Sequence, residues 1–257
     1  MIRNAAILLF FAMAVAHTGR LMGVPQPADT EQRLPAGAFM RNDTLFFLDD
    51  EHVESDGFRT ILKVYVETDR NSDAFRRFCG VAAPDSEYNR SAFEANLRHL
   101  RKKVPEALKR HDLHGCPTMW LPLCSVGGRY YFDGLNPYPI SITDSLFVHQ
   151  YMDGPWPARI DGFELSEPGH YRFLTTSLNG ERNEIDLYTI DTLRRIAVLR
   201  ELHGSDATFR LLAASEPVDR FDLLVWECND LPNGDEIPVD TIDFDRLLAP
   251  YQLKTSE

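Results

Sequence analysis

From Met119 onward, apolar and polar side chains alternate in short runs, and this pattern restricts the fold more than any other feature of the chain. Turn sequences such as Gly127-Gly128 and Asn179-Gly180 separate the runs. Short connections place consecutive strands side by side, so residues 118–228 are predicted to form an antiparallel β meander. Roughly eight or nine such strands are expected to close into a barrel or to fold into two layers, because either arrangement leaves few bare edges.

Strands of the meander are predicted at residues 120–126, 129–132, 140–150, 158–166, 170–177, 184–189, 195–201, 208–213 and 221–227. Two more strands are expected earlier in the chain, at 44–48 and 60–67. The second of these alternates clearly, with Leu62, Val64 and Val66 on one face.

A helical part is expected at 70–115, between the two groups of strands. Apolar residues recur there every three or four positions, which predicts an amphipathic helix around 91–111. Ser91 and Glu94 have the spacing of a capping box at its start, and Pro105 is expected to kink or split it. The predicted fold class is therefore α+β, a predominantly antiparallel β meander, barrel-like or two-layered, with an inserted amphipathic helix.

Residues 1–16 have the order of parts of a secretory signal peptide. Arg3 supplies a positive charge, an apolar run covers 5–15, and Ala14 and Ala16 form a small-x-small cleavage site. The run is shorter than the roughly 20 residues that a membrane-spanning helix needs. A buried N-terminal helix is the alternative, but nothing polar divides the run into a single apolar face. We expect export, to the periplasm or out of the cell, with no membrane span after cleavage.

Residues 17–40 are rich in Pro, Gly and polar side chains and show neither the hydrophobic period of a helix nor that of a strand. This composition predicts a flexible tether. The rest, 41–257, is expected to be a single mixed domain. Its net charge, −12 for the whole chain, disfavours a nucleic-acid binder, which needs cations to displace phosphate counterions. A basic stretch at 90–112 and an acidic one at 216–257 are typical of solvated faces, although either can meet a partner.

Four cysteines, Cys79, Cys116, Cys124 and Cys228, are disulfide candidates in an exported chain. An extended segment rising about 3.3 Å per residue separates Cys116 from Cys124 by more than the roughly 7 Å that a disulfide can bridge. We therefore expect Cys228 to pair with one of those two if any disulfide forms. Four reduced thiols are the alternative, since a core of this size needs no cross-links.

The sequence predicts no metal site and no cofactor. His111, His114 and Cys116 are competent zinc ligands, but no His-Glu pair occurs in the chain, and Pro117 follows where the helix ends. Acidic residues at 229–245 lack the register of an EF-hand. There is also no Gly-x-Ser-x-Gly elbow and no P-loop.

Aromatic residues are concentrated in the first half of the meander. Turned inward they fill a core, whereas on an open face they bind sugar rings or apolar ligands. Most are expected in the core. At least one of Tyr130, Tyr131 and Phe132 is expected to face out, and the candidate ligand-binding residues, to be tested for exposure, are Tyr131, Tyr151 and Trp156.

These patterns favour a non-catalytic binding or interaction module acting outside the cytoplasm on a protein or small-molecule partner. The alternative is a hydrolase whose ionisable groups converge only in the fold, with His149, His170 and His203 as conceivable members. A subunit of an exported complex is a third hypothesis. A cleft with two or more convergent ionisable groups favours the enzyme, and an apolar or filled interior favours binding.

Cleavage of the signal peptide is expected after Ala16, because small residues occupy the two positions that a signal peptidase recognises. Mass spectrometry of the protein recovered from an exporting host should therefore find His17 at the N-terminus. A chain that still begins at Met1 in the exported fraction would contradict this prediction.

Overall fold

The computed structural model describes residues 34–35, 37–53, 59–82, 87–216, 220–228 and 239–252. The predicted signal peptide, 1–16, and most of the predicted tether, 17–40, lie outside the described residues. The last residues of that tether, Phe39 and Met40, belong to a short strand, β1 (Phe39–Arg41). β1 pairs with β2 (Thr44–Val53), so the ordered sheet begins earlier in the chain than the composition indicates.

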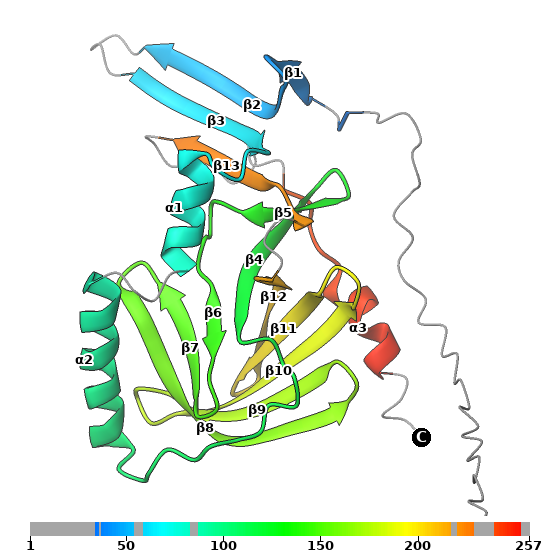
Figure 1. The fold of residues 1–257 in the computed structure, drawn as a ribbon. Helices are drawn as coiled ribbons and strands as arrows, with labels where there is room; N and C mark the ends of the chain where they lie inside the picture. Colours follow the sequence, from blue (N-terminus) through cyan, green and yellow to red (C-terminus); the bar gives the residue numbers. More distant parts are fainter. Residues whose placement is uncertain are drawn as a thin grey trace, which may run out of the picture. The chain divides into compact units, whose positions relative to one another are not determined.

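The alternating segment after Met119 closes into a barrel of 8 antiparallel strands (Figure 1). Each strand from the second onward pairs with the next in sequence, and the first strand closes the ring by pairing with both the last and the second. The barrel strands are β4 (Met119–Val126), β6 (Ile140–Ile142), β7 (Leu146–Tyr151), β8 (Gly154–Glu167), β9 (His170–Thr176), β10 (Arg182–Asp191), β11 (Ile196–His203) and β12 (Asp206–Ala214). The predicted antiparallel, β-rich α+β fold is confirmed, in its barrel form.

Apolar side chains fill the middle of the barrel. Because successive side chains of a strand point to opposite faces, every second residue of each strand faces inward. Trp120, Phe147, Ile160, Phe173 and Leu199 meet there and are almost completely buried. A barrel of this strand number has an interior just wide enough for side chains to fill or for one small ligand. In the middle of this barrel, side chains fill the interior.

Further strands extend the sheet outward from β4. They are β5 (Arg129–Asp133), β13 (Leu223–Cys228), β3 (Arg59–Glu67), β2 and β1, in that order. The β4–β5 hairpin turns through Gly127 and Gly128, whose φ angles of 57° and 76° confirm the positive-φ turn expected from the sequence. β5 leaves the barrel at this turn.

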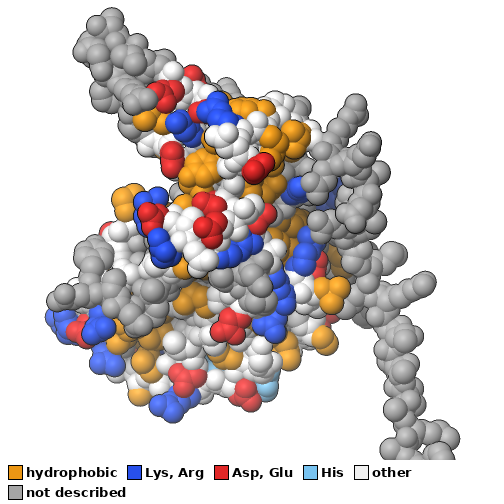
Figure 2. Space-filling model, turned by 45° about the horizontal axis from the view of Figure 1, so that its top comes forward, with side chains coloured by type: hydrophobic (Ala, Val, Ile, Leu, Met, Phe, Trp, Pro, Cys, Tyr) orange, Lys and Arg blue, Asp and Glu red, His pale blue; other side chains and the backbone are white. Residues whose placement is uncertain are grey.

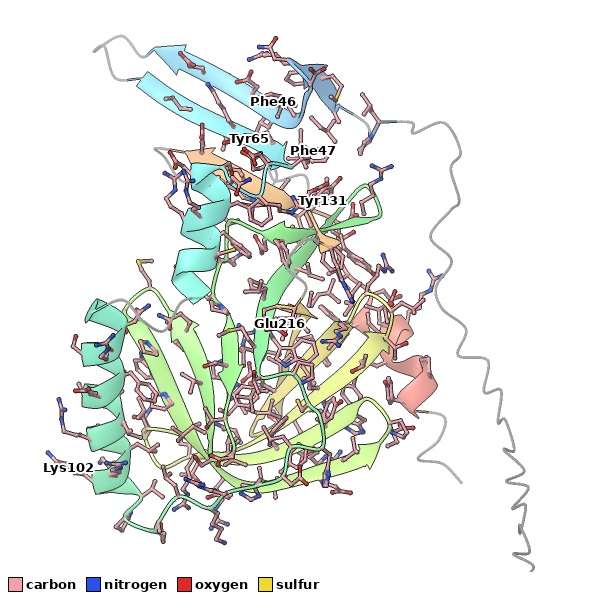
Figure 3. All side chains as sticks on the ribbon, in the orientation of Figure 1. Phe46, Phe47, Tyr65, Lys102, Tyr131 and Glu216 are labelled. Carbon is pink, nitrogen blue, oxygen red and sulfur yellow. The ribbon has the colours of Figure 1, made fainter. Side chains whose placement is uncertain are left out.

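Within the described residues, three helices pack against the outside of the strands (Figure 1). α1 (Asp73–Ala82) contributes Phe75 and Phe78 to a cluster that also contains Leu248 of α3 (Phe244–Gln252) and outward side chains of β10, β11 and β12. α2 (Glu87–Lys103) covers β7 and β8, with Leu100 at the centre of a separate cluster. Its opposite face is solvated, and Figure 3 shows Lys102 pointing away from the barrel.

The structure changes two details of the predicted helix. α2 begins at Glu87, so Ser91 lies inside the helix and does not cap it. It ends at Lys103, because Pro105 lacks the amide that a longer helix needs, and the chain continues to His111 without helical structure. The amphipathic pattern is nevertheless correct, since Leu97, Leu100 and Leu108 all join the cluster beneath the helix.

Two predicted strands also differ from the structure. The segment 140–150 is divided into β6 and β7 by a tight turn in which the Thr143 hydroxyl accepts a hydrogen bond from the Leu146 amide at 2.9 Å. The segment 221–227 becomes β13, which leaves the meander, pairs antiparallel with β3 and runs parallel to β5. The first difference comes from this local turn, and the second depends on which strands the segment meets, about which local alternation carries no information.

Replacing Phe173 by alanine should lower the free energy of unfolding by about 3–5 kcal/mol, because the cavity left in a filled barrel cannot collapse completely. Urea denaturation monitored by tryptophan fluorescence measures the change. Leu193→Ala is the matched control, since Leu193 is 86% exposed and should shift stability by less than about 0.5 kcal/mol. Equal effects of the two substitutions would show that the barrel interior is not the principal core.

Candidate functional site

Three ionisable side chains meet across one end of the barrel lumen. His149 projects from β7, Glu201 from β11 and Arg210 from β12, each at an inward-facing position. Three strands separate β7 from β11 in either direction around the ring, so a direct contact between them has to span the lumen. We call these three residues the lumen brace.

Hydrogen bonds engage both nitrogens of the histidine in the brace. His149 Nε2 lies 3.0 Å from Glu201 Oε1, and Arg210 Nη2 lies 3.0 Å from His149 Nδ1. A guanidinium group can only donate, so Nδ1 accepts and the ring proton is on Nε2, from which it is donated to Glu201. Arg210 Nη2 also lies 3.3 Å from Glu201 Oε2. The brace therefore holds a neutral imidazole between a paired carboxylate and guanidinium.

The brace is nearly buried, and its charges compensate one another. His149 and Glu201 are each 9% exposed, and the ring of His149 lies 5.1 Å from that of Phe147 in the apolar core. Burial opposes ionisation of Glu201, but the hydrogen bond from His149 and the nearby positive charges outweigh it and lower the pKa of this carboxyl group. Glu201 is thus ionised at neutral pH and neutralised locally by Arg210.

Outside the brace, an open hollow of about 660 Å³ is lined by Tyr138, Tyr151, Met152, Asp153 and Trp156. The Tyr151 ring stacks on His149 with a centroid distance of 5.9 Å, and Trp156 lies 6.0 Å from Tyr151 with the ring planes at 86°. Burial and the negative charge of Glu201 raise the pKa of Tyr151. The hollow therefore has aromatic walls, with the brace behind one of them.

The β7–β8 hairpin presents this group because its turn is tight. Tyr151 pairs with Gly154, which leaves Met152 and Asp153 as the turn residues. Gly154 has a φ of 112°, which a residue with a side chain rarely adopts, and β8 can start directly after the turn as a result. Trp156 pairs with His149, so the Trp156 ring lies diagonally across from Tyr151 on the neighbouring strand.

Of the three aromatic residues predicted to bind a ligand, the structure brings two together. Tyr151 is 44% exposed and Trp156 38% exposed, and both line the hollow. Tyr131 is only 4% exposed and packs edge-on against Phe47 at 6.1 Å, so the expectation of an exposed Tyr131 is corrected (Figure 3). The reason is that β2 and β3 extend the sheet beyond β5, and the cluster they form covers Tyr131.

Sequence reasoning missed Glu201 and Arg210. The alternation contains a signal for both. Glu201 lies two residues after the inward-facing Leu199 on β11, and Arg210 lies two residues before the inward-facing Leu212 on β12, so each also faces inward. A charged residue at such a position has to find a partner inside the barrel. The identity of that partner depends on the closure of the ring.

The histidines proposed for a hydrolase do not converge. His170 lies on the outer face of the barrel, where its Nε2 is 2.7 Å from Asp186 Oδ1. Arg172 and Arg200 also donate to this completely buried carboxylate, and Tyr188 stacks on the imidazole at 4.2 Å. Burial raises the pKa of Asp186, but these partners outweigh it and hold the pKa below its usual value.

His203, the third proposed member, is exposed at the end of β11 and is not part of the brace. Among His149, His170 and His203, only His149 thus belongs to the candidate site.

The residues considered as metal ligands have other roles. His111 Nε2 contacts the carbonyl oxygen of Ile160 at 3.2 Å, and Cys116 is buried in the barrel core. Asp240 accepts hydrogen bonds from the Ser125 hydroxyl and from the amides of Gly127 and Gly128, so this acid holds the β4–β5 hairpin. In the described part of the chain, no group of three or more His, Cys, Asp or Glu side chains is placed to hold a metal ion.

All four cysteines lie within the described residues and are free thiols. Cys116 and Cys124 are buried in different clusters, whereas Cys228 is exposed at the end of β13, so the expected pairing of Cys228 with either of them is not formed. Burial raises the pKa of the Cys116 thiol to about 12. The two buried thiols are therefore protonated and act as small apolar side chains.

A second hollow, also about 660 Å³, lies beside β8 and β9 but has a different character. Arg159 extends into it and is held by Glu106 at 2.8 Å and by Asp161 at 2.5 Å. These charges satisfy one another, and the lining offers no aromatic wall. The hollow at the barrel mouth is the better candidate for a ligand site.

Comparisons with protein-family models, with curated proteins and with solved structures found no match. A search of the helices in the described residues for one long and apolar enough to cross a membrane found none. On the face drawn in Figure 2, basic and acidic side chains are interspersed among hydrophobic ones. The proposals below therefore rest on the geometry of the barrel mouth.

Glu201→Gln should reduce stability at pH 7 by about 1–3 kcal/mol, the range for a hydrogen bond to a charged group. Because the folded pKa is lowered, ionised Glu201 stabilises the fold above the pKa of about 4.3 of an unfolded glutamate, and this contribution disappears as the pH falls through the folded value. The stability difference between wild type and variant should therefore shrink below about pH 4.

Urea denaturation at several pH values measures this difference. Glu164→Gln is the matched control, since Glu164 is an exposed glutamate on β8. A loss of stability in Glu201→Gln that stays constant from pH 7 to pH 3 would contradict an ionised brace.

Proposed function

We propose that this protein binds a small molecule at the mouth of its barrel and catalyses no reaction on it. The observation that carries the proposal is the combination of an aromatic hollow with a closed floor. Tyr138, Tyr151 and Trp156 supply flat apolar surface, and the brace and the core beneath it close the lumen. Small-molecule sites are typically concave and mainly apolar, with a few fixed polar groups.

The chemistry of the brace supports binding over catalysis. Three convergent ionisable groups are what an enzyme needs, and on that ground alone they favour the hydrolase hypothesis. A catalytic histidine, however, needs one nitrogen free to take a proton from a nucleophile or water. Arg210 occupies Nδ1 of His149 and Glu201 occupies Nε2, so neither nitrogen is available. The brace instead fixes the position of Tyr151, which stacks on it.

The proposed place of action is outside the cytoplasm, in the periplasm or the extracellular medium. The support for this part is the order of charge, apolar run and cleavage site at 1–16. A binding protein in such a compartment meets its ligand directly, without a transport step. Signal-peptide cleavage, as predicted above, tests this part independently of ligand binding.

The binding proposal predicts that N-phenyl-1-naphthylamine, an uncharged aromatic dye that fluoresces when it leaves water, binds saturably to the protein. Tyr151→Ala and Trp156→Ala should each weaken this binding about 5- to 30-fold, since each removes one aromatic wall. Fluorescence titration measures the dissociation constants.

Leu193→Ala, which removes an exposed apolar side chain on the β10–β11 turn, is the control and should leave the dissociation constant unchanged. Circular dichroism should show that all variants remain folded. Failure of the dye to bind saturably would reject the proposed function, and so would folded Tyr151→Ala and Trp156→Ala variants that bind the dye as tightly as the wild type.

A further inference from the structure

We infer that the ligand of the barrel mouth carries an organic cation of the substituted-ammonium type, such as a trimethylammonium group. The inference rests on the proposed binding function and names the class of molecule that this site takes. It follows from the arrangement of the aromatic rings and from the charges that surround them.

The rings are arranged as adjacent walls of a box. Tyr151 and Trp156 lie nearly perpendicular, at 86° with 6.0 Å between centroids, and Tyr138 adds a third ring to the lining. One face of Tyr151 is covered by His149, so the ligand meets the opposite face. A flat ring can stack on only one of two perpendicular walls, whereas a rounded alkylammonium group contacts both at once. Such groups bind to aromatic faces through the negative potential above the ring.

The charges around the hollow have the sign that favours a cation. Asp153 lines the hollow beside Tyr151 and Trp156. Burial and the negative charges of Glu201 and Asp153 raise the pKa of the Tyr151 hydroxyl, and the positive charge of Arg210 opposes them. Arg210 is paired with Glu201 at 3.3 Å and lies 3.0 Å from His149 Nδ1, so the charges of the brace are balanced locally and Asp153 supplies the negative charge of the lining.

An anionic ligand would meet the opposite conditions. It would be placed beside Asp153, against the negative faces of the aromatic rings, and in the field of a chain with a net charge of −12. A primary ammonium group retains a tightly bound hydration shell, and a lining that is mostly aromatic and apolar, with Asp153 as its one carboxylate, replaces that shell poorly. A substituted ammonium group has lost most of that shell and suits such a wall better. These comparisons leave the alkylated organic cation as the best-matched class.

Choline and 3,3-dimethylbutan-1-ol test the inference, because they have nearly the same shape and differ in the charge of the trimethyl group. Each gives a single methyl resonance, and aromatic ring faces shift that resonance upfield in proton NMR titrations. Choline should bind about five- to thirtyfold more tightly than the neutral alcohol. Its affinity should fall as salt increases, whereas that of the alcohol should not.

Two variants separate the contributions of ring and charge. Trp156→Leu retains an apolar side chain and removes an aromatic face, so it should reduce the preference for choline to less than about threefold. Asp153→Asn keeps the size of the side chain and should lower choline affinity about two- to fivefold while leaving the alcohol unchanged. Glu164→Gln removes a negative charge from another part of β8 and should change neither affinity.

The outcomes distinguish this inference from the function on which it rests. If N-phenyl-1-naphthylamine binds but choline binds no more tightly than the alcohol, the cation inference is overturned and the binding function stands. Preferential binding of a matched anion, 3,3-dimethylbutanoate, would also overturn it. If N-phenyl-1-naphthylamine does not bind saturably, the binding function itself fails.

Discussion

The pairing of β4 with both β12 and β6 is the constraint on which the rest of the structure depends. This double pairing converts a meander into a closed ring, removes the two free edges and defines an inside. It also places β7 and β11, which are distant in sequence, on opposite sides of one lumen. The apolar core, the brace and the position of the hollow all follow from that closure.

Inside the ring, the side chains at one end of the lumen are polar, whereas those in the middle are apolar. Apolar residues such as Phe147 and Phe173 fill the centre, and the lumen brace replaces them toward the mouth. A buried charge is costly unless it is paired and hydrogen-bonded, and in the brace each charged group has a partner. The brace therefore closes the lumen with polar groups of fixed orientation. Tyr151 gains a defined position from it, because its ring stacks on His149.

The proposed binding site lies at the β7–β8 turn. The β7–β8 turn leaves Met152 84% exposed and places two perpendicular rings beside an acidic residue. Binding at such a site uses a rigid scaffold to hold groups on a short connection, an arrangement common among ligand-binding proteins. The outer cluster around Asp186 has the opposite character, because its carboxylate is enclosed by cationic and aromatic partners and offers no surface to a ligand.

The sequence by itself determined the local structure: the alternation after Met119, the amphipathic face of α2 and the Gly127-Gly128 turn. These features depend on periodicity and backbone preference, which act over a few residues. The tertiary structure alone decided that the ring closes, that β13 joins β5 and β3, that Tyr131 is covered, and that His149 meets Glu201 and Arg210. Each of these is a contact between segments far apart in the chain, and the free energy that selects such contacts comes from packing across the whole barrel.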